Sequence, residues 1–246
     1  MLKKVCYCLL LVLCLACFSS VAKDSLRVVT EEWPPYNYTN DNGKVVGAAT
    51  AKVRWVLEQA DIDYTLNSYP WARAIDLASS KKNVAIFSVY RTELREQQFK
   101  WVCPLISPVP TFIFKLKART DLNIDTLDDV KRYQVSVTRG DLAQDVLTKA
   151  GFELGVNLDL AANGQISIKK LFANRIDFVI YSEKALLEQL KKINRSYDTI
   201  QKVMKLTVME NLPICIAFNK ETDDSIVNKV QQMLDLLSVI SEPPPF

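Results

Sequence analysis

Strand-like and helix-like patterns of apolar residues alternate along this chain. Short, mostly apolar runs are typical of strands that are covered on both faces of a sheet. They occupy residues 26–30, 84–89, 111–116, 134–138, 176–181 and 212–218, and a weaker one lies around Leu158. Between them, apolar residues recur at helical spacing within residues 51–60, 74–78, 142–150, 168–172 and 226–237. Further helices are expected after the capping residues Asp125 and Thr126 and from Ser182-Glu183 onward.

This repeated alternation predicts an α/β fold, with a mostly parallel sheet and helices on both sides. The pattern runs in two sets, and the proline-rich stretch Cys103–Pro110 lies between them. Two lobes are consistent with this division, and so is a single doubly wound domain of this length.

The first 22 residues have the pattern of a secretory signal peptide. Lys3 and Lys4 precede an apolar run from Val5 to Phe18, and Ser20-Val21-Ala22 is the small-x-small pattern that signal peptidase cleaves. The apolar run is too short to span a bilayer comfortably, and no second one follows. We therefore expect an exported protein of the periplasm.

The cysteines divide between the signal peptide and the mature chain. A lipoprotein anchored at Cys17 is the less favoured alternative, because Cys14 stands where an aliphatic residue is expected. Four of the six cysteines leave with the signal peptide, and Cys103 and Cys215 remain in a compartment that permits disulfides. They either form one bridge or pack as two small apolar side chains, and the sequence leaves both possibilities open.

Charge and composition exclude several functions. The formal net charge is +3, and removal of Lys3 and Lys4 leaves +1, with no basic cluster of the kind that binds nucleic acid. The chain contains no histidine, which excludes Ser-His-Asp and Cys-His catalysis and every His-ligated metal site. We expect no metal and no cofactor.

The segment after the first strand carries the first candidate binding residues. The strand Leu26–Thr30 ends in a stiff Pro-Pro turn that presents Glu31, Trp33 and Tyr36, before a polar hairpin ends at Gly47. Ligand pockets of open α/β sheets form at strand ends, so rigid aromatic rings and a carboxylate there predict a binding site. The alternative is an ordinary strand and loop whose aromatic side chains belong to the core.

The order of several motifs is more informative than any one of them. They are the opening RVVTEEWPPYNY with GKVVG, then YPWARAI, the T-E-x-R of Thr92, Glu93 and Arg95, VSVTRGD at a strand-to-helix turn, and LFANRIDFVIYSE. In this order the chain resembles the bacterial extracellular solute-binding proteins of family 3, the periplasmic amino-acid-binding components of ABC importers. The resemblance covers nearly the whole mature chain.

The resemblance implies a type II periplasmic-binding-protein fold, in which two α/β lobes joined by two crossing strands close on a small solute. The crossings are expected near Thr111–Lys115 and Pro213–Ala217. The first lobe then comprises residues 23–112 and 213–246, and the second comprises residues 113–212. This topology places Cys103 and Cys215 at the two crossings, where a bridge between them is a hypothesis.

The resemblance also implies ligand contacts around Arg95. In the family the arginine of this motif pairs with the ligand carboxylate, and a guanidinium suits this role because it forms two parallel charge-assisted bonds. A solvated arginine in a charged loop is the alternative. Ser88 and Tyr90 lie just before it, where family members use hydroxyl and main-chain N–H groups.

Aromatic and acidic contacts are expected from the same lobe. Trp33 falls where the family places an aromatic ring over the ligand, and Glu31 falls where some members have an acidic contact. Core packing is the alternative for Trp33, and a solvated turn acid is the alternative for Glu31. Trp71 and its neighbour Arg73 fall at a further pocket position, with core packing again the alternative for Trp71.

The second lobe departs from the family pattern. Gly140 and Asp141 open a helix whose free N–H groups are suited to an anionic group. The alternative for Asp141 is a role only as the cap of that helix. Ser182 stands where amino-acid binders commonly carry an aspartate for the ligand ammonium, and serine cannot supply that charge. Glu183 follows it, but its side chain is expected to project differently. This departure counts against an α-amino acid as the ligand, and it remains consistent with a solute that has a carboxylate or another anionic group.

The sequence predicts a monomeric periplasmic protein, not an enzyme, that captures a small anionic or zwitterionic solute. Its partner is the membrane permease of an ABC importer or a separate sensor. One alternative is an enzyme on the same scaffold, a dehydratase of small carboxylates with Glu31 or Glu183 as acid or base. Another is a scaffold that has lost binding, because the ending SVISEPPPF lacks the glycine and last short helix usual in the family.

Overall fold

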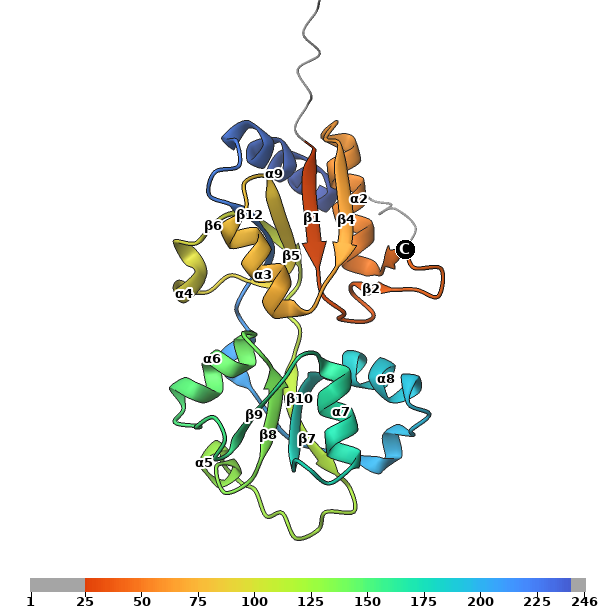
Figure 1. Ribbon diagram of the computed structural model, residues 1–246, viewed down its shortest axis with the longest axis vertical. Helices are drawn as coiled ribbons and strands as arrows, with labels where there is room; N and C mark the ends of the chain where they lie inside the picture. The colour runs from red at the N-terminus through yellow and green to blue at the C-terminus, as the bar shows by residue number, and fades with distance from the viewer. Residues whose placement is uncertain (1–24, 240–246) are drawn as a thin grey trace, which may run out of the picture.

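Two five-stranded sheets organise the protein into two lobes, one above the other in Figure 1. The computed structural model describes residues 25–239. The predicted signal peptide, the lipoprotein alternative at Cys17 and the ending at residues 240–246 lie outside the described residues. Within the described range, no helix has the length and apolar character needed to cross a membrane.

The first sheet has the strand order β4-β1-β5-β12-β6. Its strands are β1 (Leu26–Thr30), β4 (Tyr64–Ser68), β5 (Val84–Tyr90), β6 (Phe99–Ile106) and β12 (Ile214–Asn219). β1 pairs in parallel with β4 and β5, while β12 runs antiparallel to both β5 and β6. A strand from the end of the chain therefore lies inside a sheet formed otherwise by its beginning.

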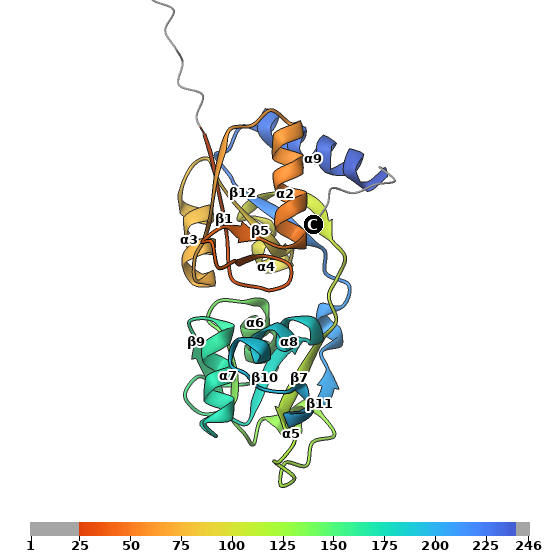
Figure 2. The ribbon, with the colours of Figure 1, turned by 90° about the vertical axis from the view of Figure 1, so that its right-hand side faces the viewer.

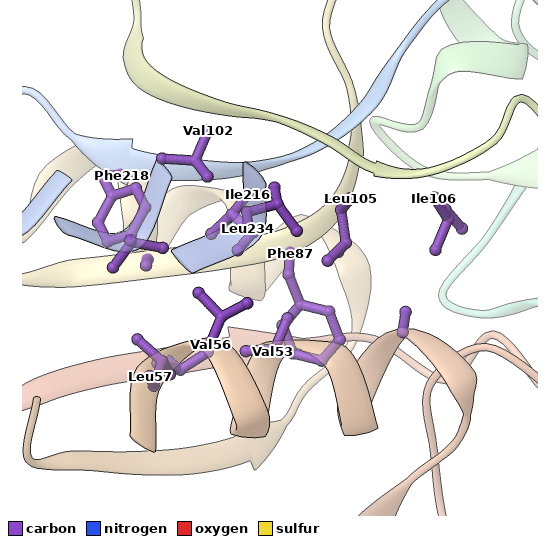
Figure 3. Close-up of a cluster of buried hydrophobic side chains, with 14 of the residues drawn as sticks. Val53, Val56, Leu57, Phe87, Val102, Leu105, Ile106, Ile216, Phe218 and Leu234 are labelled. Atoms are coloured by element: carbon purple, nitrogen blue, oxygen red, sulfur yellow. The ribbon is translucent and has the colours of Figure 1, made fainter. Parts of the chain in front are cut away.

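Helices cover both faces of this sheet. They are α2 (Ala48–Gln59), α3 (Trp71–Ser80) and α9 (Asp224–Val239). Val53 of α2 lies next to Phe87 of β5 (Figure 3), and the same cluster includes Val56 and Leu57 of α2 and side chains of β12 and α9. Ile86, the neighbour of Phe87, packs instead with α3 on the opposite face. The continuous apolar run at residues 84–89 is thus explained by burial on both faces.

The second sheet has the order β11-β7-β10-β8-β9. Its strands are β7 (Thr111–Leu116), β8 (Val135–Thr138), β9 (Leu158–Ala161), β10 (Phe178–Ser182) and β11 (Ile200–Lys205). Its helices are α5 (Leu127–Val130), α6 (Leu142–Lys149), α7 (Gly164–Phe172) and α8 (Glu183–Lys192). β10, β8 and β9 are parallel, whereas β7 is antiparallel to β10 and β11. The predicted mostly parallel α/β architecture is confirmed in both lobes.

Short elements complete the fold. They are β2 (Tyr38–Thr39), β3 (Val45–Val46), α4 (Glu93–Glu96) and two 3₁₀ turns at Tyr197–Thr199 and Thr207–Met209. β2 and β3 form the polar hairpin that was expected before Gly47. α4 follows β5 directly and carries Arg95.

The chain passes between the lobes twice, once between β6 and β7 and once between β11 and β12 (Figure 2). β7 begins at Thr111, so the first passage ends just before the predicted boundary at residue 112. The lobe boundaries stay a prediction. Next to them, Cys103 of β6 and Cys215 of β12 form a disulfide with an S–S distance of 2.12 Å. The hypothesis that these two cysteines are bridged is confirmed.

Candidate functional site

A cavity with an internal volume of about 110 Å³, partly open to solvent, lies where the two lobes meet. Its wall in the first lobe contains Glu31, Glu32, Trp33, Trp71, Ser88, Tyr90 and Arg95. The polar residues that line it from the second lobe are Thr111, Ser136, Thr138, Asp141, Ser167, Tyr181, Ser182 and Gln189. This polar lining suits a small organic molecule with several hydrogen-bonding groups.

Eight of the ten residues singled out from the sequence line this cavity, namely Glu31, Trp33, Trp71, Ser88, Tyr90, Arg95, Asp141 and Ser182. Arg73 and Gly140 do not. The Arg73 side chain is exposed, and its guanidinium carbon lies 4.7 Å from the centroid of the Tyr69 ring. Gly140 takes part through its carbonyl, which accepts bonds from the first lobe. Contact of any of the ten with a ligand stays a prediction.

The turn after β1 is fixed by one buried asparagine. The Asn37 side-chain amide donates to the Glu31 carbonyl at 2.8 Å, and its oxygen accepts from the Ser88 hydroxyl at 2.7 Å. The Trp33 and Tyr36 rings pack with centroids 4.5 Å apart. These contacts hold Glu31 and Trp33 at the cavity before any solute arrives, which lowers the ordering cost of binding.

Ser88 has a backbone conformation that is unusual for a non-glycine residue. Its φ is 64° in the middle of β5, and β12 opposite shows a register shift between Cys215 and Ile216. Such a bulge re-aims side chains, and backbone strain of this kind gathers at functional sites. We therefore interpret the bulge as the feature that turns the end of β5 towards the cavity.

Arg95 is buried at the junction of the lobes, with 6% of its surface exposed. Its Nη2 donates to the Gly140 carbonyl at 3.1 Å and lies 3.5 Å from a carboxylate oxygen of Asp145. Trp71 also donates its indole N–H to the Gly140 carbonyl, at 2.6 Å. Burial lowers the pKa of Arg95, while Asp145, Asp141 and Glu31 counteract this. Arginine stays charged even so.

Two carboxyl groups from opposite lobes are perturbed inside the cavity. Burial, with the nearby charge of Asp141, raises the pKa of Glu31 to about 8 although Arg95 opposes the shift. Burial also raises the pKa of Asp141 to about 6, against the bond that its carboxylate accepts from the Gln144 N–H at the start of α6. Asp141 is therefore the cap of α6 and also a cavity residue.

Glu32 behaves differently from its neighbour. Burial favours its neutral form, but hydrogen bonds from Ser68 at 2.6 Å and from Thr39 outweigh burial and lower the pKa of Glu32. Its carboxylate is already satisfied by the protein. Glu32 thus adds fixed negative charge to the cavity wall.

The part of the cavity formed by α8 holds one unsatisfied acceptor. Ser182 caps this helix, and its hydroxyl oxygen accepts from the Ala185 N–H at 3.3 Å. Gln189 is 4% exposed, and among the described residues its side-chain oxygen has no hydrogen-bond partner. Glu183 is absent from the cavity wall, because it accepts bonds from Tyr197 and Lys202 instead. Its different projection was expected.

Sequence reasoning missed Asp145, Gln189 and Glu32. Asp145 lies four positions after Asp141 and Gln189 lies seven after Ser182, which places each on the same helical face as a residue that was recognised. This spacing was a usable signal. Glu32 offered none, because its role depends on Ser68 of the distant strand β4.

Metal binding has no support in the described part of the chain, where no group of three or more cysteine, aspartate or glutamate side chains is arranged to hold an ion.

The two lobes and the cavity between them define the class of periplasmic solute-binding proteins. A family model supports this directly: the chain belongs to the bacterial extracellular solute-binding proteins, family 3, whose model matches residues 26–239. No curated protein sequence matches the chain.

Solved structures share the fold at low sequence identity. An ancestral arginine-binding protein bound to arginine aligns with a TM-score of 0.75 and 21% identity, over 87% of this chain and 92% of that one. A periplasmic binding protein of Salmonella typhimurium with high arginine specificity has a TM-score of 0.74 and 18% identity, over 88% and 94%. A histidine kinase sensor domain similar to periplasmic binding proteins has a TM-score of 0.76 and 16% identity, over 87% and 90%.

Proposed function

We propose that this protein captures a small amino-acid-like solute between its lobes. In this proposal the solute carboxylate pairs with Arg95, and a cationic or N–H-bearing group of the solute lies between Glu31 and Asp141. The observation that carries the proposal is the buried guanidinium at the lobe junction, in a cavity with acids from both lobes. Closure removes the ligand from water and so strengthens each of these charge pairings.

The charges of the cavity favour a zwitterion over a simple anion. The cavity wall carries three carboxyl groups, Glu31, Glu32 and Asp141, and one guanidinium, that of Arg95. A dicarboxylate has one cation to pair with and several acids to approach. The unsatisfied oxygen of Gln189 adds an acceptor for an N–H donor. Relatives in structure that were solved with arginine and glutamine agree with this solute class.

Membership of the family supports a proposal for the compartment and the partners. We place the mature protein in the periplasm, as a monomer that delivers its solute to the membrane permease of an ABC importer. Delivery to a separate sensor is the other possibility, because a histidine kinase sensor domain shares the fold. In either case the closed shape of the two lobes is what the partner recognises.

A thermal-shift screen tests the proposal. We would mix the mature protein with L-arginine, L-glutamine, dicarboxylates, short peptides and polyamines, and we expect an amino acid to raise the melting temperature. Arg95→Ala should abolish that shift. Arg132→Ala is the control, because it removes an exposed arginine outside the cavity. An unchanged shift in Arg95→Ala removes Arg95 from the site, and a screen without any stabilising compound favours a scaffold that has lost binding.

Enzymatic activity is the second candidate function. It is favoured by one observation, the pKa of about 8 for Glu31, which leaves a protonated acid in the cavity at neutral pH. Prolonged incubation with each stabilising compound, followed by product analysis, separates the two functions. Consumption that stops in Glu31→Gln identifies an enzyme, whereas full recovery of the compound supports a binding protein.

A further inference from the structure

Arg95 already has two oxygen partners within the protein, one of them a carboxylate. Within the described range its guanidinium makes one hydrogen bond and one ion pair, to the Gly140 carbonyl and to Asp145. Both partners belong to the second lobe, whereas Arg95 belongs to the first. The residue expected to hold a solute carboxylate therefore joins the two lobes.

The same nitrogen of Arg95 makes both contacts. Nη2 lies 3.1 Å from the Gly140 carbonyl oxygen and 3.5 Å from Oδ2 of Asp145. A guanidinium offers a carboxylate two forks, one formed by Nε and Nη2 and one formed by Nη1 and Nη2. Both forks include Nη2. Nη2 has two hydrogens, one directed into each fork, and the Gly140 carbonyl accepts one of them. A carboxylate that binds in either two-bond geometry therefore shares Nη2 with these protein groups and comes close to the negative charge of Asp145.

Trp71 strengthens the connection at the same carbonyl. Its indole N–H donates to the Gly140 oxygen at 2.6 Å, so this oxygen accepts from two side chains of the first lobe. The orientation of Gly140 is fixed locally, because its φ is 75° and its N–H donates to the Gln144 side chain at 2.6 Å. Trp71 is 4% exposed and held in the core of its lobe. Two rigid groups thus meet across the junction.

We propose that the Gly140 carbonyl and the Asp145 carboxylate are an internal substitute for the solute carboxylate. They hold the lobes together when no solute is bound, and an arriving carboxylate competes with Asp145 for Arg95. Asp145 is then a specificity-determining residue. Its negative charge opposes binding of a solute carboxylate at Arg95 unless a second group of the solute compensates for that repulsion. This last point rests on the proposed function, whereas the contact between the lobes does not.

The first experiment uses ligand-free protein. Small-angle X-ray scattering compares the radius of gyration of the wild type with Trp71→Phe, Asp145→Asn and the double variant. Asp128→Asn is the control, since Asp128 is an exposed acid of the second lobe paired with Lys131. We expect the double variant to have a larger radius than the wild type, the single variants to lie between, and the control to match the wild type. Equal radii for all proteins overturn the proposal.

Folding and competition are measured on the same variants. Circular dichroism identifies a variant that has not folded, and Asp145→Asn keeps the side-chain shape if Trp71→Phe fails. Calorimetry with L-glutamine and L-arginine then measures affinity. Asp145→Asn should bind about two- to fivefold more tightly than Asp128→Asn, the range expected for a partly exposed ion pair. Equal or weaker binding contradicts competition by Asp145. If neither amino acid binds the wild type, the solute assignment fails, and the scattering still decides the contact between the lobes.

Discussion

The protonation state of Glu31 depends on its burial in the cavity. Its carboxyl group has a pKa of about 8 because it is buried close to Asp141. At pH values between 4.5, the ordinary pKa of a glutamate, and about 8, Glu31 holds a proton in the folded protein and has released it in the unfolded chain. The free energy of unfolding therefore falls as the pH rises from about 4.5 to about 8.

Glu31→Gln should remove this pH dependence. Glutamine cannot ionise, so the variant should be more stable than the wild type at pH 8, by on the order of 2–4 kcal/mol, and about equal at pH 4.5. Melting temperatures of ligand-free protein across this range provide the measurement. Glu32→Gln is the contrast, because the pKa of Glu32 is lowered and its ionised form stabilises the fold at neutral pH. A difference between wild type and Glu31→Gln that stays constant with pH excludes this account.

Solute binding should release a proton from the same group. A cationic group beside Glu31 favours its ionised form and lowers its pKa on binding, so affinity for L-arginine should rise as the pH increases from 6 to 8. Calorimetry in two buffers with different ionisation enthalpies measures the proton directly. In Glu31→Gln we expect weaker binding and a smaller proton release. Binding with the same proton count in both proteins would show that Glu31 does not face the solute.

Most of the candidate site could be predicted because its residues lie where β1, β5, β8 and β10 end, and strand ends are visible in the apolar pattern. Asp145 and the Gly140 carbonyl could not be assigned to Arg95 in this way. Their contact depends on how one lobe meets the other, which no local pattern records. Arg73 neighbours Trp71 in sequence, but its side chain is exposed and does not line the cavity, because residues two positions apart on a helix face different directions.

At the scale of elements, three strands were missing from the sequence prediction, and all three are edge strands. β4 and β6 form the edges of the first sheet, and β11 forms one edge of the second. An edge strand is less covered, so it need not be apolar: residues of β4 alternate between partly buried and exposed. β6 even contains Pro104, which an edge strand tolerates. The central strands were predicted because they are buried on both faces.

The junction between the hairpin and α2 depends on Gly47. Its φ is 115°, and a Cβ there would lie 2.5 Å from the Tyr36 carbonyl oxygen. We expect Gly47→Ala to destabilise the protein by several kcal/mol, because backbone atoms would have to move as well. Gly43 of the same hairpin is the matched control: its φ is 73°, but a Cβ there meets nothing within 4 Å.

Urea unfolding of the two glycine variants measures the difference. Gly43→Ala should cost about 1 kcal/mol, the usual effect of a left-handed backbone without a clash. The larger loss in Gly47→Ala should also displace the turn that carries Glu31 and Trp33, so solute binding should weaken further in that variant. Equal losses for the two substitutions would show that the close approach to Tyr36 is relieved at no cost.

At the scale of the whole molecule, the disulfide closes a loop that contains the entire second sheet. Cys103 and Cys215 are 112 positions apart. A cross-link over such a separation restricts the unfolded chain, and replacement of both cysteines by alanine should lower the free energy of unfolding by about 3–5 kcal/mol. Reducing agent should have the same effect on the wild type and no effect on the double variant, which is the control for reduction elsewhere.

The folded arrangement itself should survive loss of the bridge. β12 is hydrogen-bonded to both β5 and β6 independently of the disulfide. The Gln231 side chain of α9 accepts from the Cys103 backbone N–H at 2.9 Å and donates to the Cys103 carbonyl at 3.0 Å. We therefore expect the double alanine variant to keep the radius of gyration and the solute affinity of the wild type while it unfolds at lower urea. A larger radius without the bridge would mean that the disulfide also sets the spacing of the two passages between the lobes, because nothing else in the variant has changed.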